Sequence, residues 1–301
     1  MGESFARGAL VEKSEARGVN KQGTANATCP VVRVYPAQKW NGLNWREIWE
    51  RRELVAALVR RDLQVRYRQT VAGVLWVLGQ PLITTLVLSL LLMRLAGQTQ
   101  VGVPYPLFVY VGLTAWAYIS HGLTKAATCF VEHAPLVQRV YLPRLIVPFA
   151  VTLAALADFG VALAFLPVLM LWFHAAPSPA ILALPLVIVL MVVTVFGLGV
   201  WLATFNAEFR DIAFALPFAL QLGLFVSPMF YSSEIIPPPL RWVYALNPVV
   251  GIVESLRWTL LSPTAPAPLL TIAISSVSAC VILLGGLYVF QRREPMLADV
   301  I

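Results

Sequence analysis

Residues 180–205 read AILALPLVIVLMVVTVFGLGVWLATF, a run of 26 positions without a charged side chain. A helix needs roughly 20 apolar residues to cross a hydrocarbon core about 30 Å thick, so this run is long enough to span a bilayer. Five further apolar segments lie before and after it, at about 71–95, 106–130, 146–173, 213–231 and 269–290. Each is continuous rather than alternating, which favours helices over a β-barrel. The sequence therefore predicts an all-α polytopic membrane protein with six transmembrane helices.

The composition of the 301-residue chain agrees with this class. Hydrophobic residues make up 59% of the chain, charged residues make up 12%, and the mean hydropathy is +0.76. Too few polar side chains remain to cover a water-soluble surface, which excludes a soluble domain and a disordered chain. Cys29, Cys129 and Cys280 lie far apart without CxxC spacing, so we expect free thiols rather than a metal site or a disulfide framework.

The basic residues indicate membrane topology rather than nucleic-acid binding. The net charge is +7, and 13 of the 22 Lys and Arg residues precede residue 71. If the N-terminus is cytoplasmic, 19 basic residues fall on the cytoplasmic side and only three, Arg94, Arg241 and Arg257, fall outside. This asymmetry follows the positive-inside rule. We expect both termini to face the cytoplasm, and no cleaved signal peptide.

The chain divides into three parts. Residues 1–40 are polar and mixed in charge, as in a flexible cytoplasmic tail. Residues 41–70 carry an apolar stripe with charged side chains opposite, which predicts an amphipathic helix in the membrane interface. Residues 71–301 form the membrane domain. Within it, the apolar pieces of residues 232–263 are too short to cross, and we expect two short extracytoplasmic helices that either line a pore mouth as gate helices or pack as a surface hairpin.

The sequence contains no motif of enzymatic chemistry. The GxxxxGK[ST] phosphate-binding loop, the HExxH zinc motif and the GxSxG nucleophile motif do not occur. His121, His133 and His174 are scattered, and we interpret each as structural or interfacial. We therefore expect a chain that is not an enzyme, holds no cofactor or metal, and serves in transport or scaffolding.

A series of short motifs gives a more specific indication. The first are Arg52-Glu53-Leu54, Arg61-Asp62-Leu63, Val65-Arg66-Tyr67-Arg68, Gly73-Val74-Leu75-Trp76 and Gln80-Pro81. Later come Tyr141-Leu142-Pro143-Arg144, Asn206 with Phe209-Arg210-Asp211-Ile212, Ser227-Pro228-Met229 and Asn247-Pro248. In this order the motifs resemble the ABC-2 type export permeases, and most closely the membrane subunits of O-antigen, capsule and teichoic-acid exporters.

This resemblance implies the permease half of an ABC exporter in the bacterial inner membrane. Six spans are half of that family's usual complement, which implies a homodimer with two copies of a separate ATP-binding subunit that uses Mg-ATP. The implied substrate is a lipid-linked polysaccharide or a related polymer. The loop after the second span could be an ordinary connection, but the resemblance favours an ATPase-coupling role for Leu136, Arg139, Tyr141, Pro143 and Arg144. On the amphipathic helix predicted at 41–70, the resemblance implies that the interface residues are Arg61, Asp62, Arg66 and Tyr67.

Two kinds of side chain within the spans are candidates for a functional role. Aromatic rings stack on the apolar faces of sugars, so a channel could use Trp76, Phe108, Tyr110, Trp116, Tyr118, Phe225 and Phe230, although lipid contact or packing also explains such rings. Asp158 is the only carboxylate deep in a span, where an unpaired charge is costly. A polymer exporter needs no proton relay, which favours a packing role for Asp158 over a functional site.

Two other functions remain open. A permease for a small drug or lipid would share the ABC-2 motifs and differ in its channel. A membrane-embedded glycosyltransferase would need acidic clusters near the membrane-facing loops, where only Asp158, Glu208 and Asp211 come close.

Overall fold

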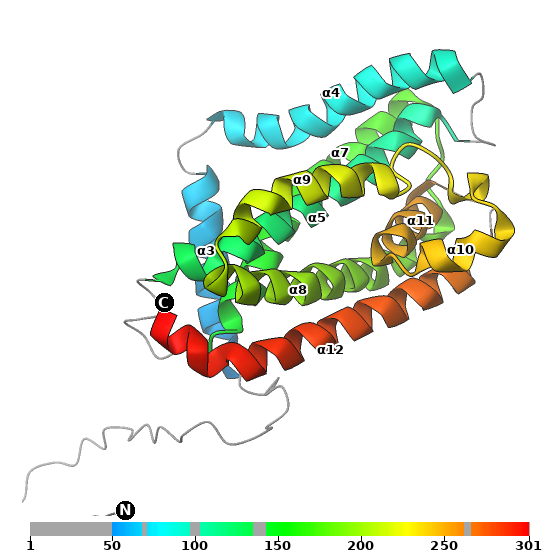
Figure 1. Ribbon diagram of the computed structural model, residues 1–301. Helices are drawn as coiled ribbons and strands as arrows, with labels where there is room; N and C mark the ends of the chain where they lie inside the picture. The colour runs from blue at the N-terminus through cyan, green and yellow to red at the C-terminus, as the bar shows by residue number, and fades with distance from the viewer. Residues whose placement is uncertain (1–49, 68–70, 97–102, 135–142, 262–265, 301) are drawn as a thin grey trace, which may run out of the picture. The chain divides into compact units, whose positions relative to one another are not determined.

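The computed structural model describes residues 50–67, 71–96, 103–134, 143–261 and 266–300 (Figure 1). Every regular element in these ranges is a helix. The α-helices are α3 (Arg52–Tyr67), α4 (Val71–Ala96), α5 (Tyr105–Glu132), α7 (Ile146–Trp172), α8 (Leu184–Glu208), α9 (Asp211–Val226), α10 (Pro238–Ala245), α11 (Pro248–Leu261) and α12 (Leu269–Val300), and the short 3-10 helices are η1 (Pro179–Ala183) and η2 (Ser233–Ile235).

Helices α8 and α12 run side by side along the bundle (Figure 1). A Cβ atom added to Gly197 of α8 would lie 2.9 Å from the Cα atom of Leu283, so the α12 backbone passes directly over this glycine. Beside it, Trp201 Nε1 donates a hydrogen bond of 2.9 Å to the carbonyl of Ile282. Small residues at helix contacts permit the close packing by which helices associate in lipid.

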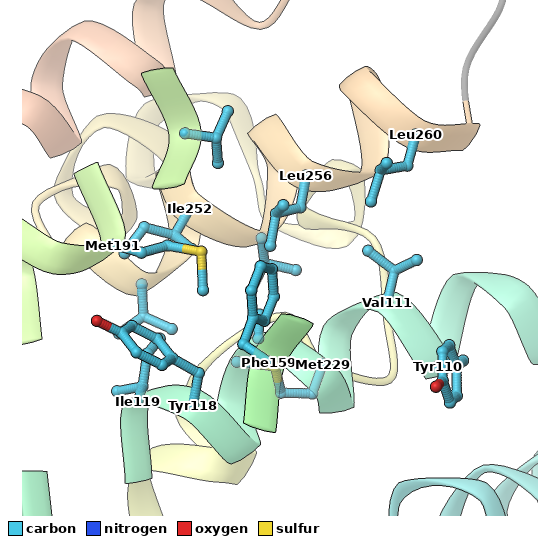
Figure 2. Packing of buried hydrophobic residues seen from close by; sticks show 14 of the residues in the cluster. Tyr110, Val111, Tyr118, Ile119, Phe159, Met191, Met229, Ile252, Leu256 and Leu260 are labelled. Atoms are coloured by element: carbon cyan, nitrogen blue, oxygen red, sulfur yellow. The ribbon is translucent and has the colours of Figure 1, made fainter. Parts of the chain in front are cut away.

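The largest buried cluster lies where α5, α7, α8 and α11 meet (Figure 2). Tyr118 of α5, Phe159 of α7 and Met191 of α8 pack there with Ile252 and Leu256 of α11. These side chains gain dispersion contacts at close-packed density. The cluster holds α11 inside the bundle, whereas most of the neighbouring α10 is exposed.

Each apolar segment expected to span the membrane forms a helix. Three described segments are long and apolar enough to cross a bilayer, Ile146–Trp172, Pro179–Glu208 and Leu269–Glu294, and Leu75–Leu91 and Asp211–Val226 are shorter apolar helices. The predicted helical class is therefore confirmed for the described residues, and the count of six spans stays a prediction.

Two predicted ends differ from the structure. The sixth segment was expected to end at about residue 290, but α12 continues to Val300. The fifth segment was expected to continue to about residue 231, but α9 ends at Val226. Ser227 takes an extended conformation, with ψ at 154°, because it precedes Pro228. The short helices predicted within 232–263 are present as α10 and α11.

Helix α3 lies within the segment 41–70, where the sequence predicts an amphipathic helix. Its buried residues Val55 and Leu58 pack against the first turns of α7. A location in the membrane interface stays a prediction for this helix, and the predicted tail at 1–40 lies outside the described residues.

Candidate functional site

An ion pair joins the end of α3 to the middle of α7. Asp158 accepts hydrogen bonds from the Arg66 guanidinium through Oδ2 and from the Tyr67 hydroxyl through Oδ1. The Arg66 and Asp158 side chains keep 28% and 19% of their surface exposed. The carboxylate predicted deep in a span is therefore paired, and its partners come from a helix about 90 residues earlier in the chain. We call these three residues, together with His121, the anchor.

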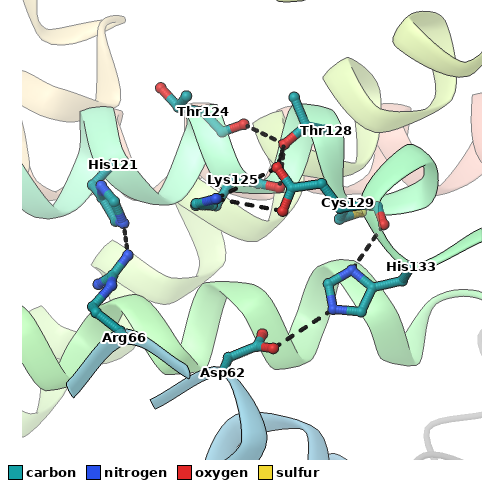
Figure 3. Close-up of polar contacts among 9 residues, drawn as sticks. Asp62, Arg66, His121, Thr124, Lys125, Thr128, Cys129 and His133 are labelled. Carbon is teal, nitrogen blue, oxygen red and sulfur yellow. Dashed lines mark hydrogen bonds and ion pairs between the residues drawn. The ribbon is translucent and has the colours of Figure 1, made fainter. Parts of the chain in front are cut away.

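His121 completes the anchor from α5. Its Nε2 atom contacts Arg66 Nη2 (Figure 3). A guanidinium can only donate hydrogen bonds, so Nε2 is the acceptor side of this contact. One arginine therefore links α3 to both α5 and α7.

A second polar contact holds α3 one turn earlier. His133 caps the C-terminus of α5, and its Nε2 atom lies 3.6 Å from Oδ1 of Asp62 (Figure 3). On the other side of the ring, Nδ1 lies 3.0 Å from the carbonyl oxygen of Cys129. The Asp62 carboxylate raises the pKa of His133, and the Cys129 carbonyl acts in the same direction, because both favour a proton on the ring. Burial of the ring opposes this shift.

A chamber of about 700 Å³ lies beside the anchor, between α4, α5 and α7. This volume falls within the range of about 300–1,000 Å³ that is usual for small-molecule sites. The side chains around it are Arg66, Trp76, Val77, Gln80, Pro81, Thr114, Ala117, Tyr118, Ser120, His121, Thr124, Ala155, Asp158, Phe159 and Ala162. The chamber thus combines small apolar residues with aromatic rings, hydroxyls, an amide and an ion pair.

The hydroxyl groups on the α5 wall are oriented by their own helix. Thr124 Oγ1 donates to the carbonyl of Ser120 at 2.8 Å, and Ser120 Oγ donates to the carbonyl of Ala117 at 3.3 Å. Because the hydroxyl protons are used in this way, the two oxygens are left as hydrogen-bond acceptors. This wall can therefore accept hydrogen bonds from a polar ligand.

A smaller cleft of about 340 Å³ lies on the other side of Arg66. Its charged walls include Arg61, Lys125 and Glu132. Lys125 and Glu132 form an exposed ion pair of 3.4 Å. Arg66 and His121 line both cavities, so the anchor lies between the chamber and this more highly charged surface.

At the far end of α5, a buried arginine supports α11. Arg257 donates to the carbonyls of Met229 at 2.8 Å, Phe108 at 3.3 Å and Tyr231 at 3.4 Å, and its guanidinium carbon lies 3.4 Å from the centre of the Phe108 ring. Three carbonyls and an aromatic face therefore solvate a cation that is only 7% exposed. The contacts join α11 to α5 and to the segment after α9.

The structure separates the seven candidate channel aromatics. Trp76 and Tyr118 line the chamber. Phe108 lies under Arg257, and Tyr110 donates a hydrogen bond of 2.8 Å to the carbonyl of Ala162, so these two rings hold helices together.

The remaining candidate aromatics lie near α9. Trp116 is half-buried and packs against Gly223 of α9, while Phe225 and Phe230 lie with their ring centres 6.2 Å apart at the end of that helix. A channel role for the seven rings stays a prediction. The chamber gives a geometric basis for this role in two of them, Trp76 and Tyr118.

Among the residues predicted for ATPase coupling, Leu136, Arg139 and Tyr141 lie outside the described residues. Pro143 and Arg144 form the turn before α7, and Arg144 Nη1 donates a hydrogen bond of 2.5 Å to the carbonyl of Glu294 in α12. On the predicted interface helix, Asp62, Arg66 and Tyr67 make the contacts described above, and Arg61 is exposed at the smaller cleft.

Sequence reasoning missed the polar face of α5. Thr114, Tyr118, His121 and Lys125 recur at intervals of four, three and four residues, which places them on one side of a helix. This spacing was a usable signal. It does not reveal that Arg66 meets this face, because that contact joins residues 55 positions apart.

Long apolar helices define the general class of the chain, a multi-pass membrane protein, in which the chamber brings a few polar side chains together among apolar ones. The sequence profile described as "ABC-2 type transporter" matches residues 53–261. The chain therefore belongs to the ABC-2 type transporter family.

Curated relatives match most of the chain. The O-antigen export system permease protein RfbA of Myxococcus xanthus is 28% identical over 259 residues, which are 84% of this chain and 97% of the relative. A protein of the same name from Klebsiella pneumoniae is 24% identical over 254 residues, which are 83% of this chain and 95% of the relative. A second Klebsiella pneumoniae protein of this name is 22% identical over 250 residues.

Proposed function

We propose that this chain is the permease subunit of an ABC exporter that moves a lipid-linked polysaccharide of the O-antigen kind across the bacterial inner membrane. The observation that carries the proposal is the similarity to O-antigen export permeases, which extends over at least 95% of the relatives' length. The chamber gives physical support, because its hydroxyl, amide and ionic groups suit a hydrated cargo better than a wholly apolar bundle would.

Deletion of the gene in the source bacterium tests this function. We expect the surface polymer to disappear and the lipid-linked polymer to accumulate on the cytoplasmic side, with both defects reversed by the wild-type chain. Immunoblots of intact cells and of membrane extracts measure the two pools. Normal surface polymer in the deletion strain would show that this chain is not its exporter.

The proposed topology has six spans with both termini in the cytoplasm, and it follows from the distribution of basic residues. Cysteine-accessibility labelling tests it in a chain whose native cysteines are replaced. A cysteine at His174, after α7, should react from outside, and a cysteine at Glu208, at the end of α8, should react only from inside. Labelling of the Glu208 position from outside would contradict the number of spans.

The motor of the proposed exporter is a separate ATP-binding subunit, present as two copies beside two copies of this chain. We expect the purified chain to show no ATP hydrolysis, and turnover free of contaminating ATPase would contradict this division of labour. The loop before α7 is the proposed docking element. Arg139→Glu should weaken co-purification of the ATP-binding subunit and stop export at normal membrane levels of the chain. Unchanged co-purification together with wild-type export would remove Arg139 from the interface.

A further inference from the structure

Helix α12 continues past the end of its neighbour α8. Its apolar run ends at Phe290, whereas the helix itself continues to Val300. Glu208, the last residue of α8, forms an ion pair with Arg293. The seven residues that follow this pair extend α12 by roughly 10 Å, at 1.5 Å per residue. We call residues 294–300 the α12 extension.

Contacts with two other elements fix the base of the α12 extension. Besides the ion pair with Glu208, the guanidinium carbon of Arg293 lies 4.8 Å from the centre of the Phe205 ring of α8. From the turn before α7, Arg144 Nη1 donates a hydrogen bond of 2.5 Å to the carbonyl of Glu294. The place of the extension beside α8 and this turn is therefore set by the fold of the bundle.

Arg144 also relates the α12 extension to the proposed docking element for the ATP-binding subunit. It stands at the end of the loop before α7, which is that docking element. A single arginine side chain joins the end of this loop to the backbone of α12. Because the proposed topology places both on the cytoplasmic side, a subunit that docks on the loop also meets the extension.

The sequence of the α12 extension indicates what kind of surface it can bind. Met296, Leu297 and Val300 occupy positions on one side of a helix. Its residues with formal charge are Glu294 and Asp299, both acidic. A helix that lies on the anionic inner leaflet carries Lys and Arg beside its apolar side, and residues 294–300 contain neither. The extension therefore suits an apolar protein groove with a basic rim better than a lipid surface.

We propose that the α12 extension is a second docking element for the ATP-binding subunit, an inference that rests on the export function proposed above. The side of the helix that carries Met296, Leu297 and Val300 enters a groove of that subunit, as an amphipathic helix does in helix-in-groove recognition. Asp299 meets basic side chains at the rim. Docking on both the loop before α7 and α12 fixes the orientation of the ATP-binding subunit on the bundle.

Co-purification of the ATP-binding subunit with tagged permease tests this docking in the complete transporter. Leu297→Asp should lower the recovered ATP-binding subunit about tenfold, because it places a charge in an apolar contact. Ala298→Asp is the matched control, since it adds the same charge one residue later on another side of the helix, and it should leave the recovery unchanged. Both variants should reach normal membrane levels, because they lie beyond the apolar run.

Photo-crosslinking in intact membranes identifies what covers the α12 extension. Leu297→p-benzoylphenylalanine should capture the ATP-binding subunit. The same replacement at Tyr288, which is 42% exposed within the apolar run of α12, should not capture it. Capture at position 297 of lipid alone, or of a second permease copy alone, overturns the proposal.

The recovery measurements decide the proposal independently of the crosslink. Wild-type recovery of the ATP-binding subunit with Leu297→Asp, together with wild-type export, overturns docking by α12. If that variant is absent from the membrane, a chain that ends after Glu294 replaces it, and wild-type recovery and export by this shorter chain have the same meaning. Either result leaves the export function intact. Failure of the wild-type chain to restore export in the deletion strain would instead refute the proposed function itself.

Discussion

Replacing Arg66 with Met tests whether the anchor holds α3 on the bundle. The substitution keeps an apolar stem and removes the guanidinium from Asp158 and His121. Removing one partner from a fully buried ion pair costs about 3–5 kcal/mol. Here the two side chains keep 28% and 19% of their surface exposed, and the Tyr67 hydroxyl still donates to the carboxylate. We therefore expect a loss of about 2–3 kcal/mol, since solvent screens part of the interaction.

The thermal midpoint of the full chain in lipid nanodiscs measures this loss. At about 2–4 °C per kcal/mol for a chain of this size, Arg66→Met should melt roughly 4–12 °C lower. Lys125→Met is the matched control, because the Lys125–Glu132 pair is 44% exposed on both sides and should contribute no more than about 1 kcal/mol. Adding Asp158→Leu to Arg66→Met should recover part of the stability, since no unpaired charge remains. Equal melting of Arg66→Met and Lys125→Met would refute the anchor.

Three further perturbations test other contacts. The Asp62 carboxylate raises the pKa of His133, and the resulting stability is fully present below about pH 6.5 and is lost as the pH rises through the folded-state pKa. His133→Gln should therefore lower the melting temperature more at pH 6 than at pH 8.5. An equal loss at the two pH values would contradict this contact. Arg257→Met removes a donor that the carbonyls of Phe108, Met229 and Tyr231 share, and it should lower the melting temperature by at least about 6 °C. A wild-type melting curve would show that the arginine does not support α11. Gly197→Ala should destabilise the folded chain by about 1–3 kcal/mol, because the new methyl group meets the backbone of α12. Gly160→Ala is the control, since Gly160 has open space around it and alanine should stabilise its helix by up to about 1 kcal/mol. Denaturant unfolding that ranks the two variants in the opposite order would refute the packing of α8 on α12.

The helices could be predicted from the sequence because their signal is local. Long uncharged runs identify the membrane helices, and proline marks several of their limits. The end of α9 was predicted too late because apolar character continues past Val226, while Pro228 forces Ser227 out of the helical conformation. Proline alone does not fix such a limit, because α4, α7 and α9 continue through Pro81, Pro167 and Pro217.

The candidate site was only partly predictable because its contacts join distant parts of the chain. The sequence singled out Asp158 as an acid within a span, for which it favoured a packing role, and the family resemblance singled out Arg66 and Tyr67 together as interface-helix residues. Their meeting depends on how α3 lies on α7, which periodicity along one helix cannot specify. The same limit explains why Trp76 could not be distinguished from Phe108: both are aromatic residues in apolar runs, and only the fold places one beside a chamber and the other beneath Arg257.

The order of the anchor residues along the chain has a consequence for synthesis. A ribosome completes Arg66 and Tyr67 about 90 residues before Asp158. The cation and the hydroxyl that pair with the acid therefore already exist when α7 leaves the translocon. An acidic side chain that is expensive to place in lipid by itself can thus enter beside its waiting partners. Arg257 follows the same order, since its acceptor carbonyls at Phe108, Met229 and Tyr231 all precede it. The nascent chain therefore contains the partners of both Asp158 and Arg257 before it contains the charge itself.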